Sequence, residues 1–205
     1  MKKLIILMIL LLAISVSAQE PLTGLTGKGI KVGIGMANLT GDDVEGLDMK
    51  MGINGGAFIT YNFSPMFAIQ PELLFTMKGA KESIEGMDDD FKYKFNYLSM
   101  PILLKVCIPT ESNIKPSLLV GPEVSMLMSA KASLGDESMD MKDALKDIDF
   151  GLAFGGGIDV QMETMKLTFD ARYTLGLSSI DDSGEGEESA SVKNTNISVM
   201  VGLGF

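Results

Sequence analysis

The chain has 205 residues, and its 27 acidic against 17 basic residues give a formal net charge of −10 at pH 7. This charge argues against nucleic acid as a partner, because phosphate backbones are bound by basic surfaces. The chain contains no histidine, which excludes the usual histidine-dependent hydrolases, and its single cysteine excludes an internal disulfide.

Residues 1–18 predict a cleaved secretory signal peptide. Lys2 and Lys3 give it a positive start, residues 4–14 form an apolar run, and the stretch that ends at Ala18 has the small residues of a cleavage site. No later segment approaches the roughly 18–20 apolar residues of a membrane helix. We therefore expect residues 19–205 to form one exported domain.

The last stretch, residues 193–205, alternates in hydrophobicity with a period of two. Small or polar residues alternate with an apolar series, which consists of Ile197, Val199, Val201, Leu203 and Phe205. This period predicts a β-strand with one apolar face. The chain ends on Phe205, and we interpret this terminal aromatic residue as the assembly signal of a closing barrel strand.

The same alternation predicts seven earlier strands, at 28–40, 51–63, 66–78, 91–107, 114–129, 148–162 and 165–177. A phase change near 97–101 predicts a β-bulge, where Pro101 would be tolerated. The connections are alternately long and short. The long ones, at 41–50, 79–90, 130–147 and 178–192, hold most of the acidic residues, and the third predicts a short helix around 140–146.

This pattern predicts an all-β fold, an eight-stranded antiparallel up-and-down transmembrane β-barrel in the cell outer membrane, with short periplasmic turns and long outer loops. The closing strand would pair with 28–40 and place Phe205 at the periplasmic rim. A soluble barrel of the lipocalin kind is the alternative, but its apolar face points inward. Here the charges within strands lie on the small-residue face, which favours the membrane barrel.

Four segments resemble the PorT-like outer-membrane β-barrel proteins, the small barrels of the porin family. They are IQPELLFTMKG (69–79), YLSMPILLK (97–105), LLVGPEV (118–124) and RYTLGL (172–177). With the signal peptide and Phe205, the resemblance covers nearly the whole mature chain. It implies an eight-stranded outer-membrane barrel and assigns no activity.

The alternation also predicts a cluster of charges inside the barrel. Its members are Glu72, Glu123, Asp159, Asp170 and Arg172, and Lys31, Lys78, Lys105 and Lys166 would also face inward. Arg172, the one arginine of the chain, is expected to pair with Glu72 or Glu123. The cluster is interpreted as a salt-bridge plug, because an eight-stranded barrel is only wide enough for side chains. The alternative is a narrow ion path with Arg172 at its constriction.

No catalytic, cofactor-binding or metal-binding residues are predicted. The glycines at 155–157 lie inside a strand, where they indicate a crowded interior rather than a nucleotide loop. Asp88, Asp89, Asp90 and the pair Asp181–Asp182 suggest calcium, but they lack the ligand spacing of an EF-hand. The acidic loops could instead recognise an extracellular ligand.

We therefore expect an outer-membrane barrel with a structural or surface-interaction role and no catalysis. A low-conductance pore is the second hypothesis, and a soluble lipocalin-like carrier is the third. The expected partners are outer-membrane lipid and lipopolysaccharide, and the barrel-assembly machinery during biogenesis. The barrel is expected to be a monomer.

Overall fold

The structure is a computed structural model, and it describes residues 23–41, 44, 46–83, 90–135, 137–182 and 191–205. The predicted signal peptide lies outside these residues. Nearly all regular structure in the described part is β-strand, joined by one 3-10 turn, η1 (Lys142–Ala144). No helix among these residues is long and apolar enough to cross a membrane.

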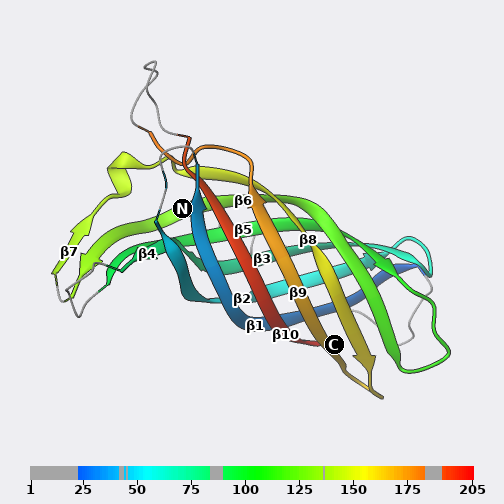
Figure 1. Cartoon of the computed structure of the whole chain (residues 1–205). Helices are drawn as coiled ribbons and strands as arrows, with labels where there is room; N and C mark the ends of the chain where they lie inside the picture. The colour runs from blue at the N-terminus through cyan, green and yellow to red at the C-terminus, as the bar shows by residue number, and fades with distance from the viewer. Residues whose placement is uncertain (1–22, 42–43, 45, 84–89, 136, 183–190) are drawn as a thin grey trace, which may run out of the picture.

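Eight long strands form the wall of the molecule (Figure 1). They are β1 (Gly24–Thr40), β2 (Asp48–Asn62), β3 (Phe67–Lys78), β5 (Phe91–Cys107), β6 (Ile114–Leu134), β8 (Ile148–Gln161), β9 (Lys166–Gly176) and β10 (Lys193–Gly204). Each is antiparallel to its neighbours, and β1 pairs with both β2 and β10. The sheet therefore closes on itself, which confirms the predicted eight-stranded antiparallel barrel.

Side chains alternate between the two faces of the wall as the sequence predicts. Val199 and Val201 of β10 are 52% and 41% exposed and Phe205 just after it is 62% exposed, whereas Met200 between the two valines is 2% exposed. The outward face is apolar, and the inward face carries most of the buried polar and charged side chains. A soluble carrier would reverse this arrangement, so the wall suits a lipid environment.

The two ends of the barrel differ. One end, called here the loop end, carries the long connections and two short strands, β4 (Ala80–Glu82) and β7 (Glu137–Asp140). The other, the turn end, carries the short connections and the final strand's terminus. There the Phe205 amide donates to the Lys28 carbonyl at 2.8 Å, and the Lys28 amide donates back at 3.2 Å.

The predicted β-bulge lies in β6 and not in β5. Asn96 pairs with Ser129 and Tyr97 with Leu127, so Met128 is the extra residue between them. Strand β5 keeps its alternation throughout, with Tyr97 and Ser99 both buried. The sequence changes phase because the apolar residues of β5 move from the inner to the outer face at Leu98.

The predicted loop at 130–147 is also more ordered than expected. Strand β6 continues to Leu134 and forms a hairpin with β7, from Lys131 opposite Asp140 to Leu134 opposite Glu137. The predicted helix at 140–146 is reduced to the single turn η1. This hairpin was missed because strands that leave the lipid no longer need an apolar outer face.

Closure at β1 and β10 makes the terminal residue a test of assembly. We expect deletion of Phe205 to lower the yield of folded barrel severalfold, because the deletion removes both hydrogen bonds to Lys28 and the terminal aromatic ring. Heat-modifiable gel migration of membrane fractions measures this yield. Phe205→Tyr is the matched control and should assemble normally; normal assembly of the deletion variant would contradict the prediction.

Candidate functional site

The centre of the barrel interior holds four charged side chains from three strands. Lys31 comes from β1, Glu72 from β3, and Asp170 and Arg172 from β9. The Lys31 amine lies 2.8 Å from a Glu72 oxygen and 2.6 Å from an Asp170 oxygen. The four side chains are 0–3% exposed. Two positive and two negative charges neutralise one another, and we call this set the central group.

Arg172 donates three of the hydrogen bonds in this group. Its Nη1 and Nη2 donate to Glu72 Oε2 and Oε1 at 2.7 and 2.9 Å, and Nη2 also donates to Asp170 Oδ2 at 2.7 Å. The contact with Glu72 is bidentate, the strongest geometry open to a guanidinium and a carboxylate. Of the two partners that the sequence predicts for Arg172, the structure has Glu72; Glu123 lies in a different group.

Small residues on the neighbouring strands make room for these long side chains. Arg172 lies opposite Gly155 on β8 and Ser198 on β10, and Asp170 lies opposite Gly157. A methyl group at Gly157 would come within 2.7 Å of an Asp170 carboxylate oxygen. The glycine run of β8 therefore sits where the interior is most crowded, as expected for a narrow barrel.

A second group lies toward the loop end. The Lys78 amine is 3.1 Å from Glu123 and 3.4 Å from Asp149. Asn194 Nδ2 donates to Asp149 Oδ2 at 3.0 Å and to the Tyr97 hydroxyl at 3.2 Å. The Tyr97 ring also lies 5.0 Å from the Lys78 amine. Asp149 and Tyr97 were missed as partners, although the alternation of their strands, followed without interruption, places both inside.

A third group lies toward the turn end. The Lys105 amine donates to both oxygens of Asp159, at 2.9 and 2.8 Å, and Lys166 approaches the same carboxylate at 3.8 Å. The predicted cluster is therefore divided along the barrel. Glu72, Asp170 and Arg172 are joined in the centre, whereas Glu123 and Asp159 belong to the groups on either side.

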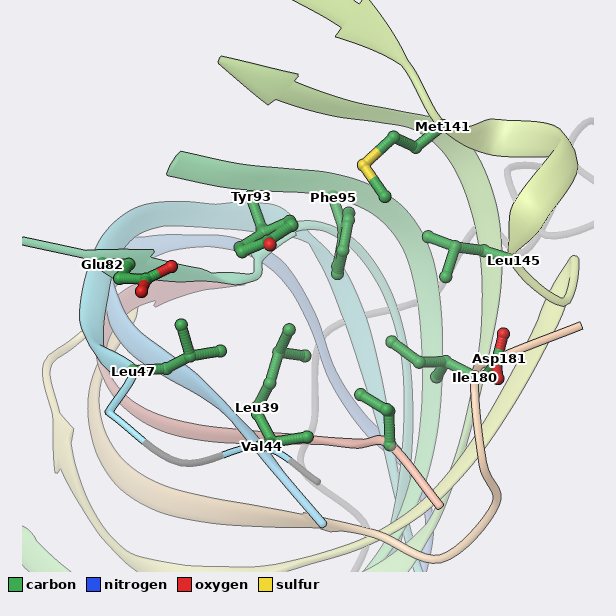
Figure 2. Close-up of a pocket in the computed structure, with 11 residues that line it drawn as sticks. Leu39, Val44, Leu47, Glu82, Tyr93, Phe95, Met141, Leu145, Ile180 and Asp181 are labelled. Atoms are coloured by element: carbon green, nitrogen blue, oxygen red, sulfur yellow. The ribbon is translucent and has the colours of Figure 1, made fainter. Parts of the chain in front are cut away.

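An apolar pocket of about 320 Å³ lies at the loop end (Figure 2). Leu39, Phe95 and Ile180 contribute buried apolar side chains, and Figure 2 shows them pointing into the same space. The other lining residues are Val44, Leu47, Glu82, Tyr93, Met141, Leu145, Asp181 and Val192. Sequence reasoning missed this pocket, because its walls combine the ends of β1 and β5 with connections that looked merely polar and acidic.

The acidic stretches show no metal geometry in the described part of the chain. Asp88 and Asp89 lie outside the described residues, and Asp90 pairs with Lys81 at 3.1 Å. Hydrogen bonds from Lys81 and Ser83 hold the pKa of Asp90 below its ordinary value. No set of three or more acidic or cysteine side chains gathers around a common point among the residues that the structure describes.

The central group generates a stability prediction. Arg172→Met removes the bidentate partner of Glu72 and leaves one uncompensated negative charge in the interior, which we expect to cost about 3–5 kcal/mol of unfolding free energy. Urea titration of the barrel refolded into lipid vesicles measures this cost.

The double variant Arg172→Met with Glu72→Met is the matched control. It leaves Lys31 paired with Asp170, so the interior is neutral and the loss should be smaller than in Arg172→Met alone. The account of the central group would be contradicted if Arg172→Met were as stable as the natural chain. It would also be contradicted if the double variant lost as much unfolding free energy as Arg172→Met and Glu72→Met lose when their separate losses are added.

Comparison with known proteins agrees with this architecture. Residues 18–182 match the family described as "Outer membrane protein beta-barrel domain". No curated protein sequence matches the chain. The solved structures that share the fold include the following two. Neisserial surface protein A is 15% identical, with 87% of this chain and 97% of that chain covered and a TM-score of 0.51. OprG from Pseudomonas aeruginosa is 16% identical, with 92% and 98% covered and a TM-score of 0.50.

The family match covers well over half of the chain, and the fold match covers almost all of both solved barrels. The narrower PorT-like assignment stays a prediction. A closed β-barrel is the architecture that the family description names. The chain therefore belongs to the outer membrane protein beta-barrel domain family.

Proposed function

We propose that the protein is a closed outer-membrane barrel that interacts with partners at the cell surface through its loop end, without catalysis or conduction. The observation that carries this proposal is the central group. Lys31 and Arg172 each bind both Glu72 and Asp170, and all four side chains are almost completely shielded from solvent.

Such a group is a poor ion path. A passing ion would have to displace charged side chains that already satisfy one another, in a barrel only wide enough for side chains. Breaking one buried ion pair costs several kcal/mol, because the remaining charge is left without a partner. The two flanking groups add further ion pairs on either side of the centre. A plugged interior therefore favours a role outside the lumen.

The loop end offers the surface for such a role. The β6–β7 hairpin projects from it, and Met139 on its β7 strand is 71% exposed. The pocket opens among the same connections. Connections held on a rigid barrel are the usual site of recognition. The absence of histidine from the chain also supports a binding role over hydrolysis.

Planar-bilayer recording tests the closed lumen. We expect the refolded barrel to give no reproducible unit steps. The double variant Arg172→Ala with Glu72→Ala is the comparison, because it removes the bidentate ion pair at the middle of the central group and should admit a small current. Reproducible steps from the natural chain that shift when Arg172 is neutralised would favour the pore and overturn the proposal.

Surface labelling tests which end faces outward. In a Cys107→Ser background, we expect Met139→Cys to react with a membrane-impermeant maleimide on intact cells. Ser112→Cys, in the exposed short connection at the turn end, is the matched control and should react only after lysis. Labelling of Ser112→Cys on intact cells, with Met139→Cys protected, would reverse the orientation and contradict a surface role for the loop end.

A further inference from the structure

Four lysines gather on the outward face of the barrel near the loop end. Lys81 on β4 lies directly opposite Lys92 on β5, and Lys94 on β5 lies directly opposite Lys131 on β6. Their neighbour Tyr93 lines the pocket, so the alternation of β5 turns Lys92 and Lys94 away from the interior. We call these four residues the lysine patch.

Like charges directly opposite each other destabilise a pair of strands. The first pair, Lys81 and Lys92, is compensated, because Asp90 forms an ion pair with Lys81 and also interacts electrostatically with Lys92. Lys81 and Lys92 therefore need no further negative partner. The uncompensated positive charge of the lysine patch is therefore concentrated at the second pair, Lys94 and Lys131.

The second pair, Lys94 and Lys131, has much less negative charge near it. Asp140 lies opposite Lys131 on β7, but no ion pair joins them in the described part of the chain. On its other side Lys94 borders Gly79, which has no side chain, and it repels the nearby Lys50. This positive site stands out in a protein with a net charge of −10.

The position of this pair along the barrel axis indicates which layer of the membrane it contacts. On β5 the outward apolar series runs through Met100, Ile102 and Leu104, which are 39–48% exposed, and begins at Leu98. Lys94 lies four residues before Leu98, about 13 Å along the strand at the usual rise per residue. On β6, Lys131 follows shortly after the exposed Met128. The pair therefore lies just beyond the lipid-facing band, at the level of headgroups.

We propose that Lys94 and Lys131 bind a phosphate group of a phosphorylated glycolipid in the outer leaflet. A phosphate oxygen placed between the two ammonium groups replaces their repulsion with two charge-assisted hydrogen bonds. Basic residues at the membrane surface recognise anionic headgroups in this way. This site lies on the side of the barrel and is independent of recognition by the loops and of the closed lumen.

Thermal unfolding in defined vesicles tests the site. The probes are phosphatidylcholine vesicles that contain either diphosphorylated lipid A or its enzymatically dephosphorylated form, and the readout is the midpoint of the heat-modifiable gel shift. We expect the natural chain to unfold at a higher temperature with the phosphorylated lipid. The double variant Lys94→Gln with Lys131→Gln should lose most of this rise.

The effect of the double variant on stability, relative to the natural chain, should have opposite signs in the two lipids. Without phosphate, removal of the repulsion should leave the double variant at least as stable as the natural chain; with phosphate, it should be the less stable of the two. The single variants Lys94→Gln and Lys131→Gln should each lose part of the rise. Each therefore provides a separate readout if the double variant refolds poorly.

Two controls complete the experiment. Lys142→Gln with Lys146→Gln removes two lysines of the loop end outside the patch and should keep the full rise. Sodium phosphate added to vesicles without lipid A should not reproduce the rise; if it does, the pair recognises free phosphate and the lipid assignment is wrong. A full rise in the double variant would overturn the proposal.

Discussion

The hydrogen bonding between β1 and β10 is the constraint on which the rest of the structure depends. Their register runs without interruption from Gly29 opposite Gly204 to Thr40 opposite Lys193. Lipid offers no hydrogen-bonding partners, so a sheet that spans it must have no open edge. Once the edge is closed, one face of every strand must be apolar toward lipid, and the other must fit a narrow interior.

The narrow interior explains both the charges and the glycines. An eight-stranded barrel has room for side chains but no channel of bulk water, so each buried charge needs a partner of opposite sign. Glu72, for example, binds Lys31 and Arg172 together. Buried ion pairs of this kind add little net stability compared with apolar packing, but they are costly to break. They therefore fix the shape of the lumen, which supports the proposed role at the outer surfaces of the barrel.

Much of this was predictable because alternation with a period of two is a strong signal wherever one face meets lipid. The strand order and the inward placement of Arg172 follow from it. The alternation leaves both Glu72 and Glu123 open as partners of Arg172, and only the packing of the interior selects Glu72. The signal fails where strands leave the lipid: the β6–β7 hairpin has polar outer residues, and the bulge at Met128 shifts the phase of one strand against its partner. The pocket depends on segments that are distant in the sequence, which place Leu39 and Ile180 in one apolar cluster, and no local pattern encodes this.

Closure of the sheet can be measured directly by solid-state NMR of the refolded barrel in lipid bilayers. The account predicts amide contacts across the first and last strands, in particular between Gly33 and Met200 and between Val32 and Val201, which are direct partners in the register. It also predicts slow hydrogen exchange along both strands. Absent contacts together with rapid exchange of these amides would show an open edge and contradict the barrel on which every other inference rests.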